Sequence, residues 1–138
     1  MGPIHFLYST PLEINEDTTR QWIYLVSKQE SADIQEVSLH FLNSSTLREI
    51  NKVHLSHDYE TDVITFDHSF GTGLCADIMI SPEDVKENAD NLDVSFKDEL
   101  DRVMIHGILH LLGYDDKNES DRELMREKED HYLNLRPH

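Results

Sequence analysis

The sequence predicts an α+β fold, in which a small mixed four-stranded sheet packs against about five helices within one domain covering residues 1–138. Two observations support this prediction. Four short runs rich in β-branched and aromatic residues are interspersed with five helical patterns in the order β-α-β-α-β-β-α-α-α, which is typical of layered structures. The 138 residues contain no internal repeat, low-complexity tract or Pro/Gly-rich linker, so no boundary between domains is predicted.

The first half of the chain predicts two strands, each followed by a helix. IHFLYS at residues 4–9 is a short apolar and aromatic run and predicts a strand, whereas residues 16–29 carry apolar side chains at helical spacing. VSLHFLN at residues 37–43 alternates apolar and polar positions, which is the period of a strand. Thr46 and Glu49 then form a capping box, which predicts the start of a short helix.

The second half predicts a pair of strands followed by three helices. Residues 62–69 and 74–81 are rich in β-forming residues and flank a glycine-bearing turn, which favours antiparallel pairing. Ser81, Ser95 and Ser120 each stand three positions before an acidic residue, and each predicts the N-terminus of a helix.

The chain is strongly acidic: 28 Asp and Glu against 12 Lys and Arg give a formal net charge of −16. Because nucleic acids are bound mainly through Lys and Arg, non-specific nucleic-acid binding is expected to be poor. Cys75 is the single cysteine, so no internal disulfide can form, which fits a reducing compartment. Neither a membrane-spanning apolar stretch nor a signal peptide is evident, so the expected location is the cytoplasm, without membrane partners.

The segment HGILHLLGYDD at residues 106–116 places two histidines in an otherwise apolar helix. His106 and His110 are four residues apart and therefore lie on one helical face, where both imidazoles reach a single metal ion. Gly113 ends the helix, and Asp116 follows three residues later, where the chain is able to return toward the same ion. Asp115 is the adjacent candidate for this third ligand, but the spacing favours Asp116.

The alternative to a metal site is a pair of buried histidines hydrogen-bonded to the backbone. For the two histidines alone this alternative is favoured, whereas the glycine and the acid at their offsets reverse the preference. The spacing is the frame of the metzincin proteases, but Gly107 stands where H-E-x-x-H enzymes carry the glutamate that activates water. The pattern therefore predicts a metal centre and argues against a protease.

Three protein ligands with an open fourth position are typical of a catalytic zinc site. Imidazole nitrogens favour one zinc ion, although other divalent transition metals such as nickel or copper bind such ligands too. A carboxylate from Asp116 neutralises one of the two charges of the ion. Bound water would therefore be less acidic than in a site built from three histidines.

Three segments resemble the YbeY family of metal-dependent endoribonucleases, which mature ribosomal RNA in bacteria. HGILHLLGYDD is similar to the family signature H-G-x-L-H-L-x-G-Y-D-H at every specified position except the last, where Asp116 stands for histidine. Residues 50–66 resemble the segment N-x-x-x-R-x-x-D-x-x-T-D-V-L-S-F, with Leu55 in place of the arginine that is thought to engage RNA phosphate. Residues 76–81, ADIMIS, are similar to the strand G-D-I-x-I-S.

The resemblance implies a YbeY-like metal-hydrolase domain whose metal ligands are His106, His110 and Asp116. It implies a metal-dependent endoribonuclease specific for single-stranded RNA, acting in ribosomal RNA processing, small-subunit maturation and ribosome quality control. The implied partners are ribosomal RNA and the small ribosomal subunit or its assembly factors. Three residues lie close to Leu55 in sequence: Lys52, His54 and His57. They either replace the missing arginine or are solvated surface residues.

Without the protease glutamate, another carboxylate has to orient the attacking water. Asp77, on a predicted strand, and Asp62 are the candidates. Each is equally able to hold the N–H group of a ligand histidine, which is the favoured role, or to form a turn. Glu99 lies two turns before His106 on the same helix. It is a further candidate for such a hydrogen bond, or else a solvated acid.

Two other functions are compatible with the sequence. The first is a ribosome-assembly factor whose metal is structural and which cuts nothing; the replaced arginine and the altered ligand favour it. The second is a metal hydrolase of another substrate, such as a peptide or a small ester, which needs a base from outside the helix motif. A protein that is stabilised by metal but leaves single-stranded RNA intact would identify the first alternative.

Overall fold

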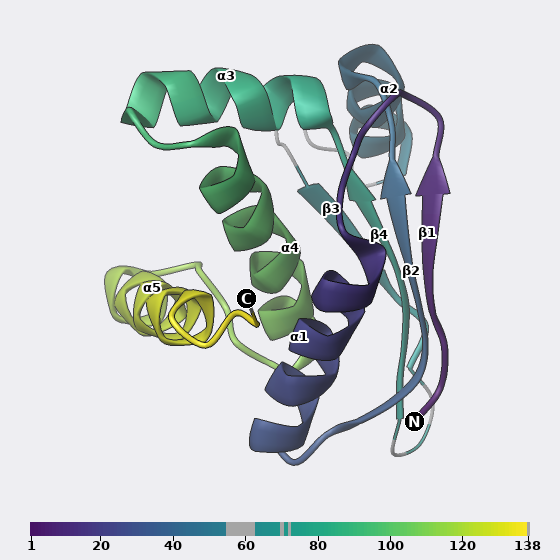
Figure 1. Cartoon of the computed structure of the whole chain (residues 1–138), viewed down its shortest axis with the longest axis vertical. Helices are drawn as coiled ribbons and strands as arrows, with labels where there is room; N and C mark the ends of the chain where they lie inside the picture. Colours follow the sequence, from purple (N-terminus) through teal and green to yellow (C-terminus); the bar gives the residue numbers. More distant parts are fainter. Residues whose placement is uncertain (55–62, 70, 72, 138) are drawn as a thin grey trace.

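The computed structural model of the chain describes residues 1–54, 63–69, 71 and 73–137 (Figure 1). Along the chain its elements are β1 (Ile4–Tyr8), α1 (Glu16–Gln29), β2 (Asp33–Phe41), α2 (Ser44–His54), β3 (Val63–Asp67), β4 (Gly73–Ile80), α3 (Pro82–Leu92), α4 (Phe96–Leu111) and α5 (Glu119–Leu133). Within the described residues, the strands and helices confirm the predicted α+β class and the predicted order of elements. No helix among them is long and apolar enough to cross a membrane.

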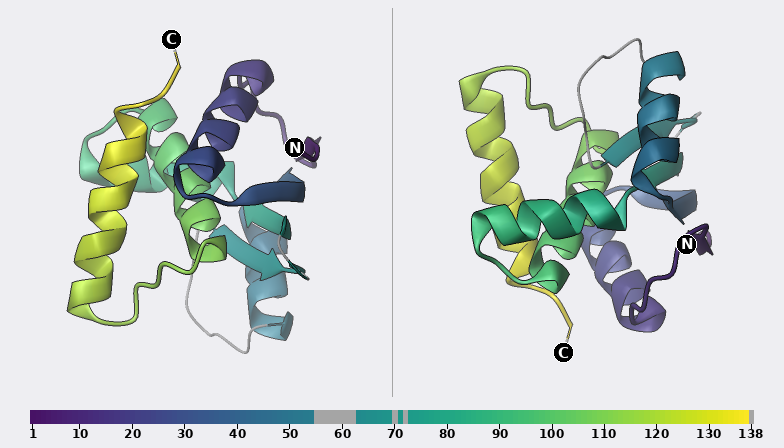
Figure 2. Two further views of the ribbon diagram at one scale, coloured as in Figure 1. Left: turned by 90° about the horizontal axis from the view of Figure 1, so that it is seen from below. Right: turned by 90° about the horizontal axis from the view of Figure 1, so that it is seen from above.

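The strands form one mixed sheet in the order β1-β2-β4-β3. β1, β2 and β4 pair in parallel, and β3 pairs with β4 in the antiparallel sense predicted for these two runs. α1 and α4 lie on one face of the sheet and α2 lies on the other (Figure 2). Alternate residues of β4, from Leu74 to Ile80, are buried in the same core as α1 and α4. The residues between them therefore point to the opposite face of the sheet.

The central helix of the fold is α4, which has core residues around most of its circumference. α5 packs against α4 on the side away from the sheet (Figure 1). The Trp22 indole N–H donates to the Tyr132 carbonyl at 2.7 Å, which ties α5 to α1 as well. The buried apolar residues of α4 are Leu100, Val103, Met104, Ile105, Ile108, Leu109 and Leu111.

Two of the predicted helix starts are confirmed by their capping bonds. The Ser81 hydroxyl accepts from the Asp84 N–H at 3.2 Å, and the Ser95 hydroxyl accepts from the Asp98 N–H at 3.1 Å. Both bonds satisfy a backbone donor that has no partner within the helix. The predicted N-termini of α3 and α4 are therefore correct.

The predicted starts of α2 at Thr46 and of α5 at Ser120 are wrong by a few residues. The Asn43 side chain accepts from the Thr46 N–H at 2.9 Å, so α2 already begins at Ser44. In α5 the Asn118 side chain accepts from the Asp121 N–H at 2.9 Å and serves as the cap. Asparagine is as good an N-cap as serine or threonine, and in both cases it stands earlier in the chain.

Gly107 lets α4 approach the sheet closely. A Cβ atom built at this position would lie 3.1 Å from Ile78 Cγ2 on β4 and 3.4 Å from Thr65 Oγ1 on β3. The position next to His106 therefore faces the sheet, and it has no room for a long side chain. Even a Cβ atom here requires Ile78 to shift by a few tenths of an ångström, so a glutamate, as in the H-E-x-x-H proteases, is disfavoured at this position.

The close approach predicts how substitutions at Gly107 behave. Gly107→Leu should destabilise the fold by about 1–3 kcal/mol, because the added atoms have no space between α4 and the sheet. Gly107→Ala is the matched control: it gains about 1 kcal/mol of helix propensity, which offsets its one tight contact. Thermal unfolding of both variants measures the difference. Equal stability of the two variants would contradict the close packing.

Candidate metal centre

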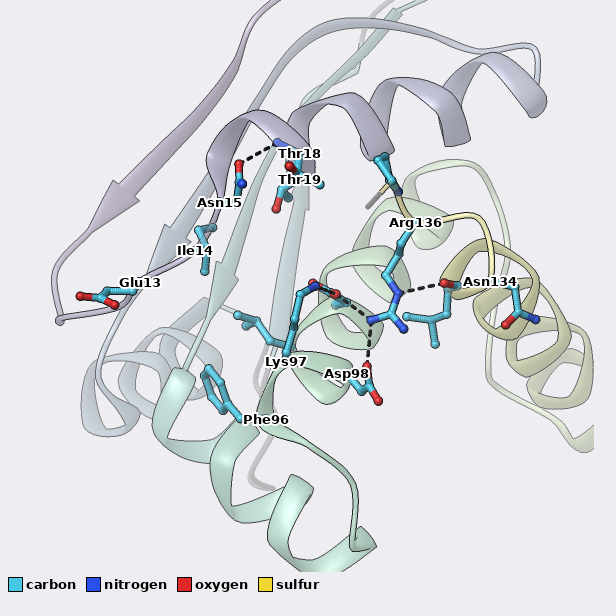
Figure 3. A pocket seen from close by; sticks show the side chains of 14 residues that line it. Glu13, Ile14, Asn15, Thr18, Thr19, Phe96, Lys97, Asp98, Asn134 and Arg136 are labelled. Atoms are coloured by element: carbon cyan, nitrogen blue, oxygen red, sulfur yellow. Dashed lines mark hydrogen bonds and ion pairs between the residues drawn. The ribbon is translucent and has the colours of Figure 1, made fainter.

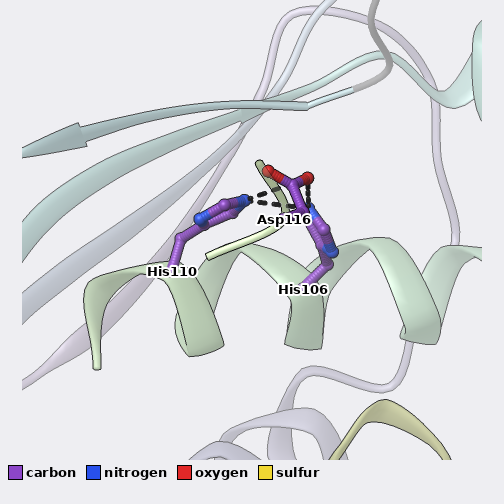
Figure 4. A group of neighbouring side chains, drawn as sticks. All are labelled: His106, His110 and Asp116. Carbon is purple, nitrogen blue, oxygen red and sulfur yellow. Dashed lines mark hydrogen bonds and ion pairs between the residues drawn. The ribbon is translucent and has the colours of Figure 1, made fainter. Parts of the chain in front are cut away.

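The structure brings together the three residues predicted as metal ligands. His106 and His110 come from α4, and Asp116 comes from the segment between α4 and α5 (Figure 4). The two Nε2 atoms lie 3.0 Å apart. Asp116 Oδ2 lies 3.5 Å from the first of them and 3.7 Å from the second. Within the described part of the chain, this is the one cluster of His, Cys, Asp and Glu side chains with such spacing.

The local backbone explains how Asp116 reaches the two histidines. Gly113 has a φ of 102°, a left-handed conformation that glycine adopts without steric cost. The Gly113 and Tyr114 N–H groups donate to the carbonyls of His110 and Leu109, each at 3.1 Å. These bonds close the end of the helix and reverse the chain, so that Asp116 comes back over the last turn of α4.

The donor set fits a zinc ion. Zinc is commonly four-coordinate and tetrahedral, with bonds of roughly 2.0–2.1 Å to nitrogen and similar bonds to carboxylate oxygen, so its ligand atoms stand about 3.3 Å apart. The three separations here, 3.0, 3.5 and 3.7 Å, scatter around that value. The small adjustment needed lies within the freedom of the Asp116 side chain, which is 44% exposed.

Glu129 on α5 holds the ring of His106 in place. Its Oε2 lies 2.7 Å from His106 Nδ1, and its Oε1 accepts from Arg102 Nη1 at 2.8 Å. The carboxylate is buried, with 9% of its side chain exposed. A carboxylate at Nδ1 favours the tautomer in which Nδ1 carries the proton, and the lone pair of Nε2 then faces the cluster.

Sequence reasoning missed Glu129, although a signal was present. Met125, Glu129 and Tyr132 form the buried stripe of α5, and an acid within such a stripe needs a partner. Glu99, the predicted partner for a ligand histidine, is buried on α4, so it is not a solvated acid. The hydrogen bond to His106 Nδ1 comes from Glu129 instead.

His110 is held in the state that metal coordination needs. Burial lowers the pKa of its imidazole, and the neighbouring His106 lowers it further, whereas Asp116 and Asp115 act in the opposite direction. The net result is a pKa below the ordinary value for histidine. The ring is therefore neutral at pH 7, as a histidine that binds a metal must be.

Asp77, predicted to orient the attacking water, lies on the other face of the sheet. It alternates along β4 with Ala76 and Ile78, whose side chains are buried in the core with α4. Its carboxylate accepts from His40 at 2.8 Å and from His68 at 2.9 Å. Burial raises the pKa of Asp77, but the two hydrogen bonds outweigh it and hold the pKa below its usual range. The structure therefore does not bring Asp77 to the histidine cluster.

Some of the predicted residues fall outside the described part of the chain. Lys52 is described and is exposed on α2. The predicted residues that lie outside the described part are Leu55, His57 and Asp62. His54 is the last residue of α2, but its side chain lies outside the described part.

A cavity of about 680 Å³ lies apart from the cluster, where the N-terminal ends of α1 and α4 meet the C-terminal segment (Figure 3). Arg136 reaches into it, but its guanidinium is bound to Asp98 and Asp101, each at 2.9 Å. This arginine is thus already neutralised by two acids. None of the three predicted metal ligands lines the cavity.

Comparisons with known proteins show which family the chain resembles. Residues 8–136 match the family model described as "Endoribonuclease YbeY". A protein of that name from Flavobacterium psychrophilum is 47% identical over 96% of this chain and 95% of its own length. Another from Karelsulcia muelleri is 41% identical over 94% and 93% of the two chains. The solution structure of a protein from Thermotoga maritima superposes with a TM-score of 0.65 at 28% identity, covering 95% of this chain and 87% of that one.

The family model spans nearly the whole chain, and relatives that align over more than nine-tenths of it are 41% and 47% identical within the aligned residues. The predicted resemblance is thereby confirmed: the chain belongs to the endoribonuclease YbeY family.

Proposed function

We propose that this protein is a metal-dependent endoribonuclease that cleaves single-stranded RNA, with zinc held by His106, His110 and Asp116. Its substrate is ribosomal RNA during small-subunit maturation and quality control. Family membership supports the reaction class. The single observation that carries the metal centre is the spacing of three ligand atoms at 3.0, 3.5 and 3.7 Å, close to the edges of a zinc tetrahedron.

A zinc ion in this position supplies a Lewis acid and lowers the pKa of a water at its open coordination position. The protein holds the ligands ready for it. Glu129 fixes the His106 ring, and burial keeps His110 neutral. Gly113 returns Asp116 to both rings. The side chains are therefore close to a binding arrangement before any ligand arrives, which reduces the cost of ordering them.

A carboxylate is still required to accept a proton from the attacking water. Gly107 leaves no space for one on α4, and Asp77 lies across the sheet. Asp116 is the acid that the structure places at the cluster, and binding through Oδ2 leaves its other oxygen able to accept a hydrogen bond. Asp62, outside the described residues, remains the second candidate for this role.

The charge of the chain disfavours non-specific binding of RNA. A protein with a net charge of −16 gains little from the phosphate backbone. Two arginines near the cluster and the cavity are already paired, Arg102 with Glu129 and Arg136 with Asp98. RNA binding therefore depends on a local cleft or on association with the small ribosomal subunit or its assembly factors.

A ribosome-assembly factor with a structural metal is the second candidate function. Leu55 favours it, because a leucine at the family's arginine position offers no bidentate contact to phosphate. A single assay, cleavage of single-stranded RNA, distinguishes the endoribonuclease from the assembly factor.

Cleavage of a single-stranded RNA tests the proposed function. The zinc-loaded protein should cut it, and chelation should abolish the cut. His110→Ala should lower the rate at least 100-fold, because only one imidazole then remains at the centre. Lys86→Ala, at an exposed position of α3 where the lysine pairs with Asp90 of the same helix, is the control for general damage and should retain metal-dependent cutting. Intact RNA with stoichiometrically zinc-loaded wild-type protein would instead favour the assembly factor.

The identity of the third ligand is tested by two neighbouring asparagine variants. Asp116→Asn should weaken zinc binding about tenfold or more, because a neutral amide oxygen is a poorer donor than a carboxylate. Asp115→Asn should leave the affinity nearly unchanged, and Asp116→His should retain the ion. Isothermal titration with zinc measures all three. The reverse order of the two asparagine variants would make Asp115 the ligand.

Metal binding should also stabilise the fold, because the centre joins α4 to the segment before α5. A ligand that binds only the native state adds about 2.7 kcal/mol at a free concentration 100 times its dissociation constant. Chelation should therefore lower the melting temperature of the wild type. His106→Ala should remove most of that sensitivity. Identical melting curves with and without chelator would count against a bound metal.

A further inference from the structure

The carboxylate of Glu30, which is partly buried, lies close to the metal-binding segment but outside the ligand cluster. Glu30 follows the last residue of α1 and acts as its C-cap. Its side chain is 12% exposed. One carboxylate oxygen accepts from the Tyr114 hydroxyl at 2.7 Å, and the other accepts from the Lys128 ammonium at 3.2 Å and from the Tyr132 hydroxyl.

This arrangement stabilises an acid that would otherwise be costly to bury. Burial raises the pKa of Glu30, but the bonds from Tyr132, Tyr114 and Lys128 outweigh it and hold the pKa below its usual range. The Lys128 ammonium also lies 5.4 Å from the centre of the Tyr114 ring, within range of a cation–π contact. The carboxylate is ionised and accepts hydrogen bonds at both of its oxygens.

The three partners of Glu30 belong to two parts of the chain that also contribute to the metal centre, namely α5 and the segment that carries Asp116. Lys128 and Tyr132 lie on α5, the helix that also supplies Glu129. Tyr114 lies between Gly113 and Asp116, in the segment that returns the third ligand. Glu30 thus connects that segment to α1 and α5, although it stands 84 residues before Tyr114 in the chain.

Apart from the ligand cluster and the contacts of Tyr114, including its packing against the core, the described hydrogen bonds and ion pairs of the returning segment are local or exposed. The Asp116 N–H bonds to the Asp115 side chain at 2.8 Å, and Arg122 reaches the Asp116 carbonyl at 3.5 Å. Lys117 lies 3.8 Å from Asp115, with 83% of its side chain exposed. Exposed contacts of this kind contribute little to stability. The part-buried bond between Tyr114 and Glu30 is the stronger constraint on where the segment lies.

We propose that Glu30 is a positioning residue for the metal centre: through the Tyr114 hydroxyl it holds the segment that presents Asp116 to His106 and His110. The inference rests on the metal centre proposed above. Glu30 touches neither the ion nor the substrate, and its effect is on how well the third ligand is placed. Groups that orient a metal ligand from behind change metal affinity by roughly 10- to 100-fold when removed.

Cobalt(II) is a suitable probe, because its visible absorption reports the number and geometry of its ligands. Apo-protein is titrated with cobalt(II), and affinity and spectrum are recorded together. Glu30→Gln and Tyr114→Phe should each weaken binding about tenfold. Both should also shift the spectrum in the direction produced by Asp116→Asn. Tyr114→Phe removes a single oxygen atom and is therefore the milder change. It still tests the proposal if the Glu30→Gln variant does not fold.

Tyr132→Phe is the matched control. It removes another hydrogen bond to Glu30 and lowers the melting temperature, but it leaves the Tyr114 bond intact. Its cobalt(II) affinity and spectrum should stay within twofold of the wild type. In an Asp116→Asn background, Tyr114→Phe should cause no further loss of affinity, because the ligand that it positions is already gone.

Wild-type affinity and spectrum in Tyr114→Phe would overturn the proposal, as would an equal loss of affinity in Tyr132→Phe. An additive loss in the Asp116→Asn background would overturn it too. Failure of the metal centre itself has a different signature, since wild-type protein would then bind no cobalt(II) at all.

Discussion

The hydrogen bond between His106 Nδ1 and Glu129, 2.7 Å long, is the interaction on which the candidate site depends. An imidazole in the middle of a core helix must find a polar partner, and this bond supplies it from α5. It fixes the ring, sets its tautomer and joins the two helices. The bond needs α5 in place, and α5 is held in turn by the Trp22 bond to the Tyr132 carbonyl and by the packing of Met125 and Tyr132 in the core. The orientation of His106 therefore follows from the packing of the whole helical layer.

The sheet restricts which side chains α4 can carry next to His106. Gly107 brings α4 so close to Ile78 and Thr65 that the helix has no room for an acid beside His106. This explains in physical terms why the chain shares the ligand spacing of a zinc protease without its catalytic glutamate. For the proposed reaction the base is therefore not on α4 beside His106, and Asp116, whose carboxylate lies 3.5 and 3.7 Å from the two Nε2 atoms, is the candidate that we favour.

Local sequence rules predicted the elements and the proximity of the three candidate ligands well. The helix of 16–29 follows from apolar spacing, α3 and α4 follow from their serine caps, and the proximity of His106, His110 and Asp116 follows from the helical repeat and Gly113. The errors arose where two residues compete for one role, as at the asparagine caps of α2 and α5. Glu30 and Glu129 were not predicted as parts of the site, because their roles depend on tertiary packing across 84 and 23 residues. The prediction for Asp77 did not take strand alternation into account. Because Asp77 alternates with Ile78 along β4, its side chain points to the face of the sheet away from α4.

The central claim is that His106, His110 and Asp116 bind one transition-metal ion, and anomalous X-ray diffraction tests it most directly. Crystals of the zinc-loaded protein would be measured on both sides of the zinc absorption edge. The account predicts a single strong anomalous peak within about 2.0–2.2 Å of both Nε2 atoms and of one Asp116 oxygen. A zinc ion bound elsewhere while these three side chains remain without one would contradict it.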